Sequence, residues 1–148
     1  MASVCSYCGC ESEEVIATLM ADHARIADLV YRIRQALDQE RFEDVGLLTR
    51  GLADEFERHS REEETGLFTQ CRMSGEGVQE LDRLIEDHRR LRPALAQESL
   101  VERPHRLRIL LEDLTRHAEV EDNDFFPFVL QALPNKCWDA LALTVPAR

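Results

Sequence analysis

The chain contains the same short pattern twice: a lone histidine, followed further along by a histidine with a glutamate four residues after it. Residues four apart lie one above the other on the same face of an α-helix. This spacing lets an imidazole and a carboxylate from one helix approach the same point. The pattern therefore predicts helices that carry two facing polar half-sites. Its members are His23, His59, Glu63, His88, His117 and Glu121.

Apolar residues recur three or four positions apart through most of the chain, and few segments alternate as strands do. This periodicity predicts long helices over about 12–38, 42–73, 78–97 and 104–133. Because the links between them are short, we expect an all-α, up-down-up-down four-helix bundle, with a short C-terminal helix over 136–143. The expected inward residues besides the repeated pattern are Ile16, Leu19, Ile26, Val30, Ile33, Leu48, Leu52, Phe56, Phe68, Leu81, Leu84, Ile85, Leu91, Leu107, Leu110, Leu111, Leu114 and Phe125.

Helix ends are marked by capping residues, glycines and prolines. Ser12 is a candidate N-cap for the first helix. The Ser-Gly-Glu-Gly run at 74–77 predicts the clearest break in the chain. Pro93 is expected to kink or end the third helix, Pro104 fits the first turn of the fourth, and Pro127 predicts a local kink there.

Composition limits the class of protein. A chain of 148 residues suits one domain with a proper core, which we divide into a cysteine-rich leader (1–11), the bundle (12–133) and a short C-terminal helix with its tail (134–148). The net charge of -11 argues against a nucleic-acid or anionic-membrane partner. No apolar run approaches the roughly 20 residues of a membrane span, and the N-terminus does not read as a signal peptide. We therefore expect a cytoplasmic protein.

The five cysteines do not read as a disulfide framework, since their count is odd and three lie within one short stretch. They fit reduced thiols in a reducing compartment. Three interpretations stay open for Cys5, Cys8 and Cys10: a labile metal site completed by Cys71 or Cys137, a redox pair that reports oxidation, and free thiols in a leader without fixed structure. The leader is also the segment through which a protein partner would bind.

The repeated pattern favours metal binding over a set of ordinary core histidines. One histidine on an apolar face is more often a hydrogen-bonded core residue than a ligand. Two buried carboxylates are different, because an isolated one costs several kcal/mol and must be paired or bind metal. The nearby arginines lie off the inward face. Imidazole and carboxylate without thiolate suit iron, manganese or zinc, and two ions sharing both glutamates with an oxo or hydroxo bridge would each keep an open position.

The order of these residues resembles the hemerythrin-like, HHE cation-binding domain family. The resemblance covers about 12–132 and rests on the phrases LxxxH at 19–23, HxxxEExxLF at 59–68 and HxxxEDxxFFP at 117–127. It implies a non-haem diiron site held by the six repeated residues listed above.

The sequence departs from the oxygen-carrying hemerythrins, whose third helix supplies two histidines one turn apart. Here Arg92 stands one turn after His88, and Pro93 follows. Asp122 stands where the carriers have a bridging aspartate, one position after Glu121. The four-His, two-Glu set is similar to bacterial iron-centre repair proteins and to the eukaryotic iron-sensing hemerythrin domain. The resemblance therefore implies redox or iron-handling chemistry more than oxygen carriage.

Our leading hypothesis is a diiron protein that binds or reduces dioxygen, nitric oxide or peroxide in a redox or oxidative-stress response. As an enzyme it would act as a peroxidase or catalase, or on nitric oxide. The alternatives are an oxygen- or iron-responsive regulatory module and an iron-centre repair or iron-donor protein. Each implies a different partner, but all of them use the same metal site.

Other polar residues near the pattern have supporting or surface roles. Asp22 and Asp87 precede histidines and either hydrogen-bond a ring N–H across the bundle or form surface ion pairs. His105 is expected at the surface and Tyr31 in the core. The remaining acids near the pattern are expected to be solvated or to support the site, and these are Glu62, Glu64, Glu119 and Asp122.

Overall fold

The computed structural model describes the backbone of residues 10–143 and the side chains of residues 12–143. Cys5, Cys8 and the side chain of Cys10 lie outside the described residues, so the interpretations of the cysteine-rich leader stay predictions. All regular structure in the described part of the chain is helical, as the sequence predicts.

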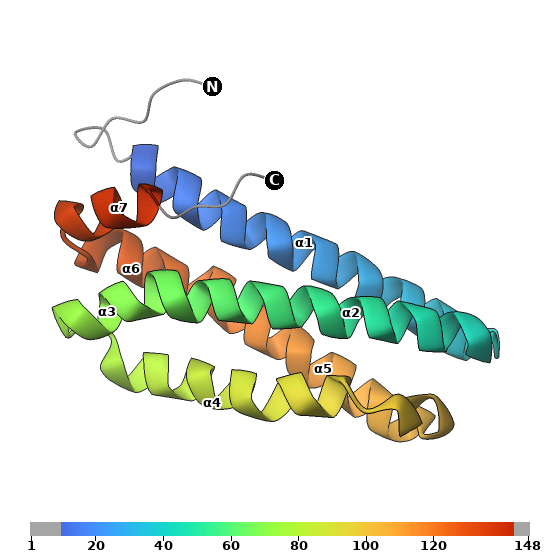
Figure 1. The fold of residues 1–148 in the computed structure, drawn as a ribbon. Helices are drawn as coiled ribbons and strands as arrows, with labels where there is room; N and C mark the ends of the chain where they lie inside the picture. Colours follow the sequence, from blue (N-terminus) through green and yellow to red (C-terminus); the bar gives the residue numbers. More distant parts are fainter. Residues whose placement is uncertain (1–9, 144–148) are drawn as a thin grey trace.

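Four helical rods run antiparallel along the bundle, and two of them are continuous stacks of shorter helices (Figure 1). The third rod is a single helix, whereas the second and fourth each pass through a five-residue π-helix in mid-course. The first rod is α1 (Cys10–Asp38), the second α2 (Phe42–Glu63), η1 (Glu64–Phe68) and α3 (Thr69–Ser74), the third α4 (Val78–Leu95), and the fourth α5 (Pro104–Val120), η3 (Glu121–Phe125) and α6 (Phe126–Ala132).

Two further elements complete the fold. A 3₁₀ turn, η2 (Glu98–Glu102), links α4 to α5. The predicted C-terminal helix is confirmed as α7 (Asn135–Ala142), which packs against α1 at the end of the bundle where α1 begins (Figure 1).

The breaks lie close to their predicted positions, with one correction. Gly75 and Gly77 take left-handed φ angles of 76° and 63°, which a glycine adopts without a Cβ clash and which reverse the chain between α3 and α4. Pro104 occupies the first turn of α5 as expected. The prediction that Ser12 caps the first helix is wrong, because α1 already begins at Cys10 and Ser12 is buried within it.

Two apolar layers fill the bundle, one toward each end. The layer near α7 includes Leu19, Phe68 and Trp138, and the other includes Ile33 and Phe56. The predicted inward residues are buried except Leu48 and Ile85, which are partly buried. Tyr31 corrects the prediction of a core residue: it is 60 % exposed, and its hydroxyl accepts a hydrogen bond from Gln35 on the outer face of α1.

Candidate metal centre

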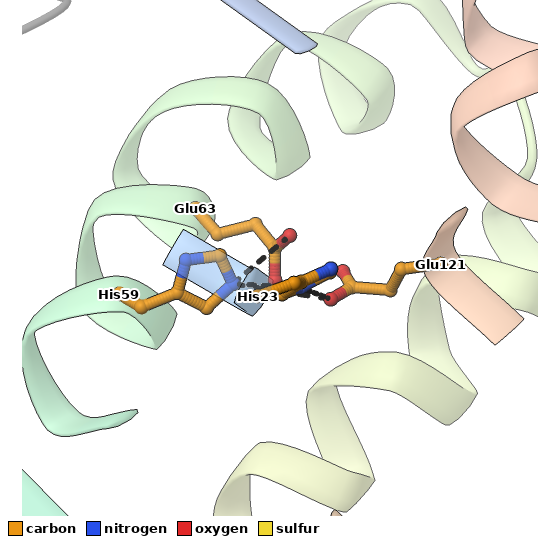
Figure 2. Close-up of side chains that lie close together, drawn as sticks. All are labelled: His23, His59, Glu63 and Glu121. Carbon is orange, nitrogen blue, oxygen red and sulfur yellow. Dashed lines mark hydrogen bonds and ion pairs between the residues drawn. The ribbon is translucent and has the colours of Figure 1, made fainter. Parts of the chain in front are cut away.

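The six repeated residues meet between the two apolar layers, each rod supplying at least one. Every one of them is at most 5 % exposed. They form two groups that share both glutamates, and within each group the candidate ligand atoms lie within 4.8 Å of one another. Figure 2 shows the first group, with the side chains pointing toward one centre from opposite sides. The first group is His23, His59, Glu63 and Glu121, and the second is Glu63, His88, His117 and Glu121.

The imidazoles face each other in pairs through their Nε2 atoms. The Nε2 atoms of His23 and His59 are 3.2 Å apart, and those of His88 and His117 are 3.1 Å apart. Two ligand atoms that are each about 2.1 Å from one ion, at a right angle, are separated by about 3 Å. The ring pairs therefore fit two metal positions.

The two carboxylates lie between these ring pairs and reach both of them. Oε1 of Glu121 is 3.0 Å from Nε2 of His23 and 3.3 Å from Nε2 of His117. Glu63 places Oε1 3.1 Å from Nε2 of His88 and Oε2 3.7 Å from Nε2 of His59. Each glutamate thus occupies the position of a bridge between the two groups.

The outer nitrogen of each ring donates to a carboxylate, and two of these bonds stay within one half of the repeat. His59 Nδ1 donates to Asp22 at 2.8 Å, and His117 Nδ1 donates to Asp87 at 2.9 Å. Each acceptor directly precedes a histidine in the sequence. Of the two roles left open for these aspartates, both occur, since each binds a ring N–H across the bundle and also lies beside arginine.

The other two outer bonds cross between the halves. His88 Nδ1 donates to Glu64 and His23 Nδ1 donates to Asp122, both at 2.7 Å. Each acceptor directly follows a candidate bridging glutamate. Since an ionised carboxylate only accepts, each Nδ1 carries a proton, and Nε2 is the ring atom left to face a metal at the centre.

Three of the four inner carboxylate oxygens have no hydrogen bond within the described residues. Within the described part of the chain, both oxygens of Glu63 and Oε2 of Glu121 are buried and accept no hydrogen bond. A buried carboxylate without a partner is costly, and a cation between the two groups would remove that cost. The donor set therefore fits a metal centre.

The pKa values in the metal-free protein reflect the same excess of negative charge. Burial and the charge of Glu121 raise the pKa of Glu63 to about 7. Burial also acts against ionised Glu121, but the close approach of Glu63, the charge of His117 and contacts with the His117 and His23 rings hold its pKa well below its usual range. Burial opposes protonation of His23 as well, yet the hydrogen bonds to Asp122 and Glu121 raise its pKa to about 10. Surroundings that favour an added proton this strongly also favour a metal cation.

A π-helix begins at or directly after each candidate bridging glutamate, and an aromatic ring at or just after its end covers the centre. The segment η1 begins one residue after Glu63, and η3 begins at Glu121. Pro127 cannot donate the N–H of an α-helical turn, which favours the wider register of η3 just before it.

The rings placed by these segments cover one histidine each. Phe68 stacks on His88, with centroids 5.5 Å apart, and Phe126 stacks on His23 at 5.7 Å. Phe56 packs edge-on against His88 at 5.6 Å from the other apolar layer. The aromatic position five residues after each glutamate, visible in the sequence repeat, thus closes the centre to bulk water.

Other residues near the pattern lie outside the centre or support it indirectly. Glu62 pairs with Arg58, while Glu119 and His105 are exposed, as expected. The sequence interpretation missed the role of Arg92, which donates to Glu64 at 2.6 Å and so supports the partner of a histidine. The acid that follows the glutamate in both halves was the available signal for these outer contacts.

The two cysteines in the described residues lie away from the centre. Cys71 and Cys137 are free, buried thiols of the apolar layer near α7. Burial, with the neighbouring Cys137 and two acids, raises the pKa of Cys71 to about 12. Neither contributes a ligand atom to the two groups described above.

No helix in residues 10–143 is long and apolar enough to cross a membrane. Searches of curated proteins and of solved structures found no match. Residues 14–129 match a family described as the hemerythrin HHE cation binding domain. This match spans most of the chain, and the buried histidine and glutamate groups within it are of the kind that hold a metal, typically iron. The chain therefore belongs to the hemerythrin HHE cation-binding domain family.

Proposed function

We propose that the centre binds two iron ions and that the protein uses them to bind or reduce a small oxidant, namely dioxygen, nitric oxide or peroxide. The observation that carries this proposal is the sharing of Glu63 and Glu121 by two otherwise separate histidine pairs. A single closed site would not need two such pairs. Manganese and zinc are the alternative metals for the same donors.

The proposed ligands are the six repeated residues, with Glu63 and Glu121 as bridges. Iron bound there would supply the redox chemistry toward the oxidant. The chain would hold the imidazoles through their Nδ1–H bonds and keep water out with Phe56, Phe68 and Phe126. A dry site strengthens the attraction between a cation and its carboxylates.

Metal analysis and optical spectroscopy test this proposal together. Protein loaded with ferrous iron under anaerobic conditions should retain about two irons per chain, and its spectrum should change on addition of at least one of the three oxidants. His105→Ala is the matched control, because this exposed histidine lies outside the centre. Full iron content with no spectral change for any oxidant would contradict oxidant handling.

Iron donation is the second candidate, and the exposure of two outer carboxylates favours it. The side chains of Asp87 and Asp122 are 36 % and 28 % exposed, and neither has a close arginine such as the one that holds Glu64, so these two ring supports can exchange with water. Transfer of iron to an apo iron–sulfur protein should then be faster than transfer from free iron at the same concentration. An equal rate would leave oxidant handling as the function.

An oxygen- or iron-responsive regulator is the remaining interpretation, with the cysteine-rich leader as the segment that binds a protein partner. The free thiols of Cys71 and Cys137 are consistent with the reducing cytoplasm that we expect for this protein. Limited proteolysis of residues 1–11 with and without iron tests this interpretation. Identical cleavage in the two states would argue against it.

A further inference from the structure

A groove of about 620 Å³ separates α4 from the rod formed by α5, η3 and α6. Its apolar part includes the buried side chains of Leu84 and Phe125 and the half-exposed side chain of Phe128. Asp87 lines the same groove, and its Oδ2 accepts the hydrogen bond from Nδ1 of His117. Only the side chain of His117 thus lies between Asp87 in the groove and the metal centre.

The charges around this groove are mostly negative. Glu80, Glu86, Asp87 and Asp124 line it together with a single cation, Arg83. Glu86 is paired with Arg89 and Asp87 with Arg90, whereas Glu80 and Asp124 form no ion pair among the residues that the structure describes. A low-dielectric cleft lined by one sign of charge raises the local concentration of the opposite ion.

The surroundings of Glu64 and Asp22, the outer carboxylates from the first half of the repeat, oppose cation entry. A smaller hollow of about 270 Å³ leads to Glu64 beside His88, but it is lined by Arg72, and Glu64 already binds Arg92 at 2.6 Å. Asp22, beside His59, is fully buried and paired with two arginines. A divalent cation would meet fixed positive charge at both of these points.

The metal centre, which lies behind His117 as seen from the groove, can receive a cation. Glu121 lies one helical turn from His117, with Oε1 3.3 Å from Nε2. Its Oε2 and both oxygens of Glu63 are buried without a hydrogen-bond donor in the described residues. These unsatisfied oxygens are an observation independent of the groove, and they point to a positively charged occupant.

We propose that divalent cations enter the centre through this groove, over Asp87 and past His117. The inference rests on the metal binding proposed above and adds the side of the bundle from which the metal arrives. Uptake then begins at the α4–α5 side and proceeds inward to the bridging glutamates.

Loading kinetics with Co²⁺ test the route, because Co²⁺ gives a visible absorption band and does not react with oxygen in the time of mixing. The test variant combines Glu80→Gln with Asp124→Asn. The control combines Glu98→Gln with Glu102→Gln, which removes the same charge from exposed positions of η2 at the other end of the bundle. At low ionic strength the test variant should load about three- to tenfold more slowly than the control, and high salt should reduce the difference. Final cobalt content and thermal stability should match.

A second variant tests the shape of the groove. Val120 lines it and is 41 % exposed, so Val120→Trp can add bulk without entering the core. This variant should load slowly at high salt as well. Equal loading by the two charge variants together with normal loading of Val120→Trp would overturn the route while leaving metal binding intact. A parent protein that retains no Co²⁺ would contradict the metal centre and the route with it.

Discussion

The half of the bundle from α1 to α3 and the half from α4 to α6 supply matching inner residues but support them differently. Each half contributes two imidazoles, one shared glutamate and two outer carboxylates. In the first half the outer carboxylates are Asp22, which is fully buried and bound by Arg25 and Arg58, and Glu64, which is bound by Arg92.

The corresponding carboxylates of the second half are less strongly paired with arginines, and Asp87 is the most exposed of the four. Asp87 is 36 % exposed, and the nearest guanidinium nitrogen, from Arg90, is 3.7 Å away. Asp122 is 28 % exposed and forms no ion pair with an arginine in the described part of the chain. The repeated inner set would define the metal positions, whereas the difference in arginine pairing predicts that the outer carboxylates of the first half are held more firmly than those of the second.

The largest expected effect should be equal in the two halves. Glu63→Ala and Glu121→Ala should each abolish tight binding of both ions, because each carboxylate belongs to both groups. Metal analysis after dialysis against a chelator measures this loss. Glu121→Ala should also lower the stability of the metal-free protein, because it leaves His23 and His117 without the carboxylate that they contact. Retention of two ions by either variant would contradict the bridging role.

Removal of an outer aspartate should lower stability more in the first half than in the second. Asp22→Ala removes a fully buried carboxylate that binds Nδ1 of His59, Arg25 and Arg58, and it should lower the free energy of unfolding by about 2–3 kcal/mol. Asp87→Ala removes a more exposed group and should cost about 1 kcal/mol or less. Urea unfolding of the metal-free proteins measures both values. Equal costs would remove the distinction between a firmly held and a less firmly held half.

The metal-free protein should lose stability as pH rises from about 6.5 to 9. The pKa of His59 is raised to about 9, because the charges and hydrogen bonds of nearby carboxylates outweigh its burial, and similar contacts raise the pKa of His117 to about 10. Groups with raised folded-state pKa values stabilise fully below their unfolded pKa, and that contribution disappears as pH rises through the folded value. Glu63, with a pKa of about 7, acts in the same direction.

The expected loss is about 2 kcal/mol or more over that range, measured by urea unfolding at each pH. Bound metal replaces the protons at the same nitrogen and oxygen atoms, so the metal-loaded protein should not show this decline. A metal-free protein whose stability is constant from pH 6.5 to 9 would show that the carboxylates do not charge these histidines.

The smallest expected effect concerns Arg92, which stands one turn after His88, where the oxygen-carrying hemerythrins have a second histidine. Arg92→Gln should speed removal of metal by a chelator about two- to fivefold, because Glu64 loses the charge that holds it against His88. Arg92→Lys should restore part of the parent rate. Arg90→Gln is the matched control on the second half and should change the rate little, since its contact to Asp87 is long. Equal rates for Arg92→Gln and Arg90→Gln would contradict the proposed difference in arginine support between the two halves.

The sequence was sufficient to predict the bundle and the residues that meet at its centre. Helical spacing determines which side of a helix each of those residues occupies, and the repeat predicts that the two halves face each other. The place of Asp22 and Asp87 before each histidine is part of the repeat, and it offered a ring N–H bond as one of two roles without deciding between them.

What the sequence could not predict depends on how the rods pack. The contact from Arg92 to Glu64 joins α4 to η1, and no local pattern specifies that approach. The π-helices shift the register after each bridging glutamate, and only η3 has a proline to signal it. Tyr31 was placed in the core because it lies two turns beyond His23, but the drift of a straight helix carries that position to the outer face.

The most direct test of the central claim is anomalous X-ray diffraction from crystals of iron-loaded protein. The account predicts two iron peaks per chain, one beside His23 and His59 and the other beside His88 and His117, with Glu63 and Glu121 touching both. A single peak, or iron bound only outside this centre, would contradict it.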